Sequence, residues 1–402
     1  MNKSNNECCC KHHHESEHKC CCENNENHSK NHCECGCEDC NCENGHCDCE
    51  CENCNCENGH CDCGCENCHC NDGNCECGKD NCECGCGHHE EHHCCCGHDH
   101  CGCENKGELL DKINDALNKY NYSLTWEQAE NEAAHIIEHH SAENNTTEVK
   151  KFLLNSLELT SLKVTDNEES ILALVEKLNK YEEKFQGLPS VATLCVYPNF
   201  IKLVSESLED DNVKITSVCG GFPSSQTFSE VKLVESALAL RDGADEIDIV
   251  LSVGKFLSTD YESIDEEIEE IKNYCGDKPL KVILETGALQ TPENIIKAAI
   301  LSMYCGADFI KTSTGKLSIG ATPGAVYAMC NAIKQYNERH KYKIGIKIAG
   351  GVKTVKDAVN YYTIVKETLG AEWLTKDLFR IGASSLANEL IGDLLGKETK
   401  YF

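Results

Sequence analysis

The chain has 402 residues and a formal net charge of −31, and 36 of its residues are cysteines. This acidic balance argues against a nucleic-acid partner, because binding to a phosphate backbone needs a basic face. The sequence contains no run of about 18 apolar residues, and no apolar segment of the secretory type follows Met1, so we expect a soluble, cytoplasmic protein that does not enter a membrane.

The composition divides the chain into three parts. Residues 1–106 hold 31 of the 36 cysteines and 15 of the 19 histidines, and apart from Met1 they include no Ala, Val, Ile, Leu, Phe, Tyr or Trp. Such a segment has nothing to bury in an apolar core. We therefore expect a Cys/His-rich region over 1–106, a helical connector over 107–147 and a large folded domain over 148–402.

The Cys/His-rich region repeats with a period of 14 residues. The motif CEDCNCENGHCDC begins at Cys37, and close copies begin at Cys51 and Cys65. CxC and CxxC steps place two soft sulfurs within reach of one d¹⁰ ion, and histidine adds imidazole ligands. The candidate metal ligands are Cys37, Cys40, Cys42, Cys47, Cys49, Cys51, Cys54, Cys56, Cys61, Cys63, Cys65, Cys68, Cys70, Cys75 and Cys77.

Three interpretations of this region stay open. It could be a disulfide framework, although an odd number of cysteines and many CxC steps argue against one. It could be a solvated low-complexity tail without a ligand. It could also bind metal ions, whose bonds to thiolates would supply the folding energy that apolar residues cannot. Its composition resembles metallothionein, which implies soft ions such as Zn, Cu(I) or Cd as partners.

The connector has helical periodicity. Apolar residues from Leu109 to Tyr120 follow helical spacing, and a second helix is predicted from Trp126 to His140 with Thr125 as its N-cap. Residues 141–147 are polar and are interpreted as a linker. His135, His139 and His140 could bind a metal, but histidines at a helix end are more often surface residues that interact with the helix dipole.

From residue 148 onward, short apolar strands alternate with amphipathic helices. Two sequences, from Thr227 and from Ser263, have the form of capping boxes, and Pro292 and Pro323 each follow a threonine cap. Eight strand–helix units over roughly 250 residues predict a (β/α)₈ barrel of the α/β class. A doubly wound sheet is the alternative, but the first predicted turn lacks its glycines. The predicted strands are 157–160, 191–196, 213–218, 246–251, 280–284, 309–312, 343–348 and 378–382.

Three charged residues lie inside or at the ends of apolar strands. Asp248 and Lys311 come from strands of the same parity, and Lys347 comes from the strand beside Lys311, so all three can face the barrel interior. Two lysines that close together repel, and one should lose its proton and become a nucleophile. The alternative is a buried ion-pair network with a purely structural role.

Glycines and hydroxyl residues follow three consecutive strands. They are Thr314, Gly315 and Lys316 after the sixth strand, Gly350 and Gly351 after the seventh, and Ser384 and Ser385 after the eighth. Backbone N–H groups in these loops, with a helix that begins after Ser385, form a typical phosphate-binding site.

Six motifs of the predicted barrel are VATLCVYP (191–198), GFP (221–223), GADEID (243–248), LETG (284–287), GADFIKTSTGK (306–316) and KIAGG (347–351). Through these motifs the sequence resembles deoxyribose-phosphate aldolase, a class I aldolase, over roughly residues 150–396. The resemblance implies that Lys311 forms the Schiff base, that Lys347 lowers its pKa and that Asp248 relays protons. The phosphate side would include Lys316, Gly350, Gly351, Ser384 and Ser385, and Cys195 would line the pocket, although a small buried cysteine needs no further role.

The resemblance implies cleavage of 2-deoxy-D-ribose 5-phosphate to glyceraldehyde 3-phosphate and acetaldehyde, without a cofactor, by a chain that could form a homodimer through its barrel. Two departures bear on the site: Glu158 stands where the family often has Asp, and Phe402 follows Tyr401, the candidate for a C-terminal tyrosine that could reach the substrate. The alternative for the whole chain is a metal-storage or detoxification protein that retains the barrel as a sugar-phosphate-binding or inactive partner.

Overall fold

The computed structural model describes residues 41–43, 46–48, 70–71, 74–75 and 106–402. Contacts divide the chain into two compact units, Met1–Glu104 and Asn105–Phe402, which are described separately. The described residues of the first unit form two antiparallel strand pairs. They are β1 (Asn41–Glu43) with β2 (His46–Asp48), and β3 (Cys70–Asn71) with β4 (Asn74–Cys75).

Two cysteine pairs are register partners in these strands. The backbone of Cys42 lies opposite that of Cys47, and Cys70 lies opposite Cys75. In each case two residues separate the paired strands in the sequence. The other predicted metal ligands lie outside the described residues.

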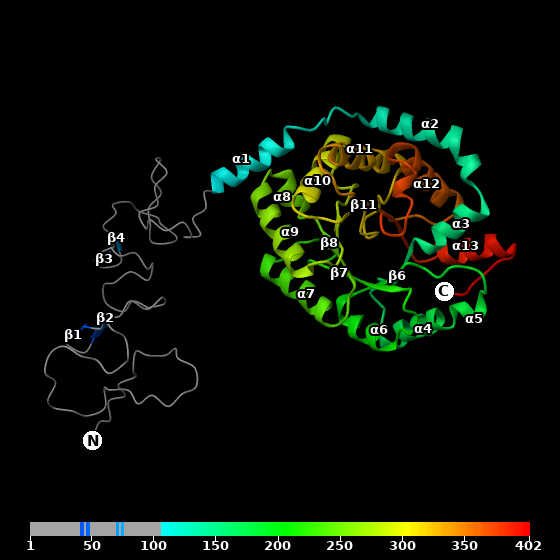
Figure 1. Ribbon diagram of the computed structural model, residues 1–402, viewed down its shortest axis with the longest axis horizontal. Coiled ribbons are helices and arrows are strands. Elements are labelled where there is room, and N and C mark those ends of the chain that lie inside the picture. Colours follow the sequence, from blue (N-terminus) through cyan, green and yellow to red (C-terminus); the bar gives the residue numbers. More distant parts are fainter. Residues whose placement is uncertain (1–40, 44–45, 49–69, 72–73, 76–105) are drawn as a thin grey trace, which may run out of the picture. The chain divides into compact units, whose positions relative to one another are not determined.

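The second unit contains a closed barrel of eight parallel strands, as the alternating pattern predicted (Figure 1). The closed order is β10-β11-β12-β5-β6-β7-β8-β9, so that neighbours in the chain are neighbours in the barrel. The strands are β5 (Leu157–Thr160), β6 (Thr193–Val196), β7 (Lys214–Cys219), β8 (Glu246–Val250), β9 (Leu280–Ile283), β10 (Phe309–Lys311), β11 (Gly345–Ala349) and β12 (Phe379–Ala383).

Helices surround the barrel as an outer ring (Figure 1). They are α4 (Glu168–Asn179), α5 (Tyr181–Lys184), α6 (Ile201–Ser207), α7 (Ser229–Arg241), α8 (Val253–Leu257), α9 (Tyr261–Cys275), α10 (Pro292–Tyr304), α11 (Pro323–Arg339), α12 (Val355–Leu369) and α13 (Leu386–Leu395). Two short 3₁₀ turns are η1 (Pro198–Phe200) and η2 (Ala371–Trp373).

The structure confirms two predicted helix starts and contradicts two others. Thr291 and Thr322 cap α10 and α11, each followed by proline at the first helical position. The capping box predicted at Thr227 is wrong, because α7 begins at Ser229 without a side-chain cap. The one predicted at Ser263 is also wrong: α9 begins two residues earlier, and Asp260 accepts the Ser263 N–H at 3.3 Å.

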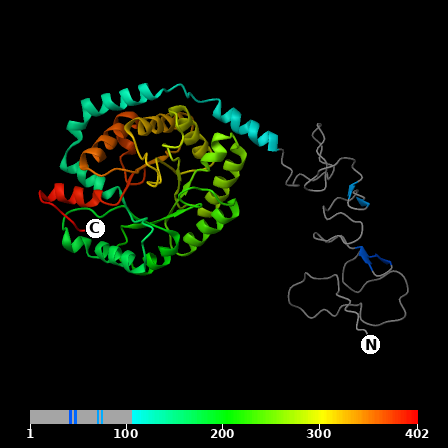
Figure 2. The ribbon, with the colours of Figure 1, turned by 180° about the vertical axis from the view of Figure 1, so that it is seen from behind.

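Three helices precede the barrel and lie along its outside, where they form the strap: α1 (Lys106–Leu117), α2 (Trp126–Asn144) and α3 (Thr147–Asn155). The predicted linker over 141–147 is wrong except for residues 145 and 146, because α2 continues to Asn144 and α3 begins at Thr147. In sequence order, α1 contacts α9 and α10, α2 contacts α11 and α12, and α3 contacts α12 and α13. Both views show the strap along this side of the ring (Figures 1 and 2).

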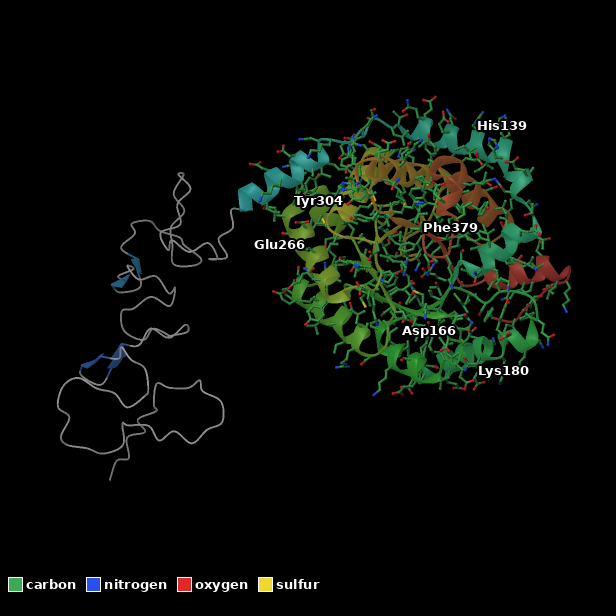
Figure 3. All side chains as sticks on the ribbon, in the orientation of Figure 1. His139, Asp166, Lys180, Glu266, Tyr304 and Phe379 are labelled. Carbon is green, nitrogen blue, oxygen red and sulfur yellow. The ribbon has the colours of Figure 1, made fainter. Side chains whose placement is uncertain are left out.

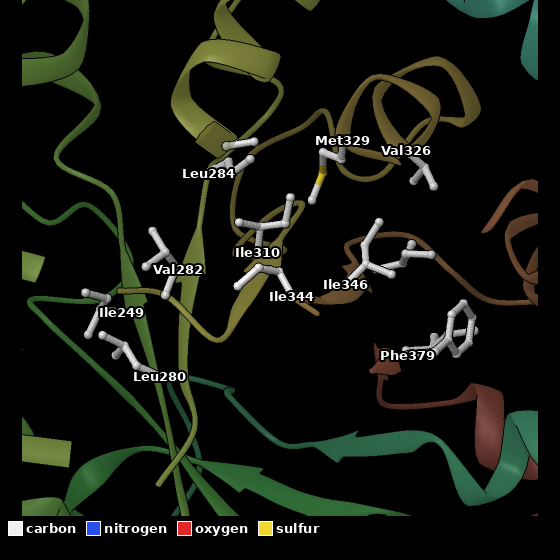
Figure 4. Packing of buried hydrophobic residues seen from close by; sticks show 14 of the residues in the cluster. Ile249, Leu280, Val282, Leu284, Ile310, Val326, Met329, Ile344, Ile346 and Phe379 are labelled. Carbon is white, nitrogen blue, oxygen red and sulfur yellow. The ribbon is translucent and has the colours of Figure 1, made fainter. Parts of the chain in front are cut away.

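The main core lies between the strands and the surrounding helices. Ile310 of β10 and Ile346 of β11 are fully buried, and Met329 and Val326 of α11 face them (Figure 4). Since successive strand residues point to opposite faces, the residues beside them, including Lys311, face the barrel interior. No helix of the described residues is long and apolar enough to cross a bilayer.

Candidate active site

Three predicted residues meet inside the barrel. The Lys311 and Lys347 ammonium groups both donate to Asp248 Oδ2, at 2.8 and 2.6 Å. Lys311 and Lys347 are register partners on β10 and β11, and Asp248 reaches them from β8. Lys311 is 3% exposed and the other two side chains are fully buried. The strand parity therefore predicted this cluster correctly.

Burial and neighbouring charges separate the pKa values of the two lysines. Burial lowers the pKa of Lys311; Asp248 opposes this effect and the Lys347 charge adds to it. Burial also disfavours charge on Lys347, but Asp248 and Glu158 outweigh it and raise the pKa of Lys347 above its ordinary value. Lys311 is thus the amine that loses its proton more easily, and Lys347 is the one that stays charged.

The pKa of Asp248 is held well below its ordinary value. Burial alone would raise it, but Lys281, Lys311 and Lys347 together outweigh that effect. The Lys281 ammonium lies 3.0 Å from Asp248 Oδ1, so each carboxylate oxygen has a lysine partner. Asp248 is consequently ionised at neutral pH.

An ionic layer next to this cluster was not predicted. Lys281 of β9 lies 2.6 Å from Glu246 Oε2, and Arg380 of β12 lies 2.9 Å from Glu246 Oε1. Burial raises the pKa of Glu246, but Lys281 and Arg380 reverse this effect and lower it to about 2. The alternation of side chains along each strand was the signal that could have revealed this layer. It places Lys281, Glu246 and Arg380 on the interior face of the barrel.

Glu158, the departure on the first strand, belongs to this network. Its Oε2 accepts from Lys347 and its Oε1 accepts from Arg380 at 3.2 Å. Gly382 of β12 leaves the space that the Lys347 side chain needs, because a Cβ at this position would lie 3.1 Å from Lys347 Cε. Glu158 is thereby a second carboxylate partner of Lys347, besides Asp248.

The predicted phosphate residues lie in the loops after β10, β11 and β12. Gly350 and Gly351 adopt φ of +94° and +85°, which residues with a side chain rarely adopt. The Gly350 carbonyl accepts the Ala321 N–H at 2.9 Å, which joins the β10 loop to the β11 loop. Ser384 and Ser385 precede α13, whose first N–H groups lie at the same end of the barrel.

Two predicted phosphate residues already have polar partners. The Thr314 N–H and hydroxyl both donate to the carboxylate of Glu285, which belongs to the LETG motif after β9. The Lys316 ammonium donates to the Leu162 carbonyl after β5. Gly315, between them, has a φ of +76°.

Cys195 lies fully buried in a small apolar cluster with Leu162 and Val218. Burial raises the pKa of its thiol to about 11. The ligand atoms of Cys195, Glu158 and Asp248 all lie within 4.8 Å of one another, which is close enough for a metal. Both carboxylates already pair with lysine ammonium groups, so a cation would have to displace those partners.

Two other sequence candidates lie on the outer helices. The Tyr401 hydroxyl donates to the Lys177 carbonyl at 2.6 Å, and its ring packs against Phe185, so Tyr401 is anchored on the outer helices. His139 lies exposed on α2, with its Nδ1 2.9 Å from the His135 carbonyl (Figure 3). This contact agrees with the interpretation of these histidines as surface residues.

Comparisons of this chain with known proteins agree on one family. The family model described as DeoC/LacD family aldolase matches residues 166–390. A putative deoxyribose-phosphate aldolase of Caenorhabditis elegans is 42% identical over 255 residues, which cover 62% of this chain and 82% of the relative. The Homo sapiens deoxyribose-phosphate aldolase is 40% identical over 219 residues, 54% of this chain and 68% of the relative.

Solved structures agree with this comparison. A putative deoxyribose-phosphate aldolase from Toxoplasma gondii superposes with a TM-score of 0.55 at 26% identity, covering 64% of this chain and 96% of that one. The deoxyribose phosphate aldolase from Aeropyrum pernix, whose structure is described as a unique tetramer, superposes with a TM-score of 0.51 at 28% identity, covering 65% and 98%.

Proposed function

The chain belongs to the DeoC/LacD family of aldolases, and we propose that it cleaves 2-deoxy-D-ribose 5-phosphate through a Schiff base on Lys311. The observation that carries the assignment of Lys311 is its shared contact with Lys347 on one oxygen of Asp248. Burial lowers the pKa of Lys311, and the charge of Lys347 beside it lowers the pKa further against the opposing effect of Asp248. A neutral amine is what attack on an aldehyde requires.

The reaction follows from these positions. The Lys311 amine attacks the substrate carbonyl, and loss of water gives an iminium ion that draws electrons from the C2–C3 bond. We assign Asp248, ionised by its lysine partners, as the acceptor of the 3-hydroxyl proton through a water molecule. Glyceraldehyde 3-phosphate leaves, and protonation and hydrolysis of the enamine release acetaldehyde and restore Lys311. The iminium is the electron sink, so the cleavage needs no cofactor.

We assign the substrate's phosphate to the loops after β11 and β12. Gly350, Gly351, Ser384 and Ser385 supply backbone N–H groups and hydroxyls there, and α13 begins directly after them. Lys316 supplies a positive charge from the β10 loop. The glycine φ values support this assignment, since they bring the main chain close to a ligand without a side chain in between.

Chemical trapping tests the assignment of Lys311. Incubation with acetaldehyde and borohydride should attach an irreversible mass increment to the peptide that contains Lys311, and Lys311→Leu should abolish both the label and turnover. Lys316→Leu, outside the buried trio, is the matched control and should keep the label. Labelling of another lysine in the wild-type protein would refute the assignment.

A second candidate function concerns the Cys/His-rich region. We propose that it binds soft cations such as Zn, Cu(I) or Cd through thiolates. The backbone register of Cys42 with Cys47 and of Cys70 with Cys75 supports this, because it brings two ligand positions of a repeat opposite each other. Native mass spectrometry of the reduced full chain with added Zn should show several bound ions, and a chain without residues 1–104 should show none. A metal-free full chain would refute the proposal.

We also propose that the barrel forms a homo-oligomer. The Aeropyrum pernix relative is described as a tetramer. The outer face of α7 and the residue before it carry apolar side chains that are 43–76% exposed in the described unit, namely Phe228, Val231, Val234 and Leu238. Light scattering should give a mass above 44.5 kDa for the wild-type chain, and Val234→Glu should lower it towards that value.

A further inference from the structure

A buried carboxylate joins the loops after β9 and β10, and the proposed Schiff-base reaction does not use it. Glu285 accepts the Thr314 N–H at 3.4 and 3.3 Å with its two oxygens, and it accepts the Thr314 hydroxyl at 2.5 Å. Glu285 is 4% exposed and Thr314 is 6% exposed. Away from water such hydrogen bonds are electrostatically stronger, so this contact fixes the two loops against each other.

The backbone at Glu285 is strained in a way that serves this contact. Its φ is +55°, in the left-handed region that residues with a side chain rarely adopt. The turn is held on both sides: Ala288 N–H donates to the Glu285 carbonyl at 2.8 Å, and Thr286 N–H donates to the Thr312 carbonyl at 2.9 Å. A strained residue of this kind persists where its surroundings determine it, and such residues cluster at functional sites.

The hydrogen bonds continue from Thr314 to Lys316. The Thr314 hydroxyl, which donates to Glu285, accepts the Lys316 N–H at 3.1 Å. The Lys316 side chain then reaches the Leu162 carbonyl after β5. In the barrel, β11 and β12 separate β10 from β5, so this side chain crosses the mouth above the strands that carry Lys347 and the phosphate loops. The direction in which Lys316 leaves its loop therefore depends on Thr314.

We propose that Glu285 and Thr314 are positioning residues for the sugar phosphate: Glu285 fixes Thr314, and Thr314 fixes the main chain of Lys316 so that its ammonium group lies over the barrel mouth. The inference rests on the proposed function. It gives Thr314 an indirect role, since its N–H and hydroxyl are already bound to Glu285. Schiff-base formation on Lys311 does not depend on this contact.

Comparison of two substrates tests the inference. We would measure kcat and KM for 2-deoxyribose 5-phosphate and for unphosphorylated 2-deoxyribose in wild type, Thr314→Val, Thr314→Ser and Glu285→Gln. In Thr314→Val, loss of the hydroxyl should raise KM for the phosphorylated sugar by about tenfold, a larger change than in kcat or in the reaction of the unphosphorylated sugar. Thr314→Ser keeps the hydroxyl and should restore the wild-type KM. Glu285→Gln keeps one acceptor oxygen, so its KM for the phosphorylated sugar should lie between those of the wild type and Thr314→Val.

The outcomes separate this inference from the proposed function. An equal loss with both sugars would indicate a merely structural contact and overturn the inference, and so would a KM for the phosphorylated sugar that stays at the wild-type value. Trapping with acetaldehyde and borohydride involves no phosphate, so failure of the wild type to label Lys311 would refute the proposed function instead. If Thr314→Val does not fold, the nearly isosteric Glu285→Gln carries the test.

Discussion

Lys347→Leu tests whether charge repulsion keeps Lys311 reactive. In the wild type both ammonium groups contact Asp248 Oδ2, at 2.8 Å for Lys311 and 2.6 Å for Lys347. The substitution removes a like charge from beside Lys311 and leaves Asp248 Oδ2 to Lys311 alone. Both changes favour the protonated amine, so the pKa of Lys311 should rise.

The geometry sets the size of the effect. At a separation of roughly 4–5 Å, two unit charges repel by about 3–4 kcal/mol at an effective dielectric constant of about 20. Since about 1.4 kcal/mol corresponds to a factor of ten in a protonation equilibrium, we expect kcat/KM near neutral pH to fall by at least about 100-fold.

The assay is the pH dependence of kcat/KM. A raised pKa means that the amine becomes neutral only at higher pH, so the acid limb of the Lys347→Leu profile should move to alkaline pH and activity should partly recover there. Lys347→Arg is the matched control, because it keeps a permanent positive charge and should leave the acid limb in place. An acid limb of Lys347→Leu that coincides with the wild-type limb would show that Lys347 acts by pairing alone.

Other predictions follow from neighbouring contacts. Glu158→Gln removes a buried charge that pairs with Lys347 and Arg380, so it should lower the free energy of unfolding, measured by urea titration, by about 3–5 kcal/mol. The control Glu176→Gln, at an exposed ion pair, should change this free energy little. Gly350→Ala places a Cβ 3.0 Å from Gly320 Cα and should raise KM for the phosphorylated sugar while borohydride labelling persists; an unchanged KM would contradict the assigned phosphate loop. Removal of residues 1–104, or addition of EDTA, should change kcat/KM by less than about twofold, because the iminium supplies the electron sink and the barrel is a compact unit of its own; inactivation by EDTA would contradict this.

The alternation of strands and helices predicted the barrel because each strand is short, apolar and bounded by turn residues. All eight strands lie where the pattern placed them, within two residues at either end. Strand parity also predicted the meeting of Asp248, Lys311 and Lys347. The predicted helix starts at Thr227 and Ser263 were wrong, because a capping box requires an extended backbone at the cap residue as well as suitable residue types. The path of the preceding chain determines those backbone angles.

The sequence did not reveal the ionic layer. Lys281 stands among apolar residues and carries a charge, a pattern that is usually assigned to a solvent-facing position. Its burial depends on Glu246 of the preceding strand β8 and on Glu158 of β5, which is distant in the chain. The partners become visible only when the register of the closed barrel is known. The link from Glu285 to Thr314 was missed for the same reason, because it joins two loops.

The strap changes how the barrel can come apart. In a barrel without such helices, each outer helix mainly contacts its neighbours in the ring, so any two adjacent strand–helix units can separate locally. Here α1 and α2 together contact four successive helices, α9 to α12, and α3 adds contacts to α13. The strap thus fastens the second half of the barrel, which carries Lys311 and Lys347, into one cooperative unit. Amides of α10, α11 and α12 should therefore exchange with solvent through a shared opening, whereas α4 and α6, which contact each other, can open separately.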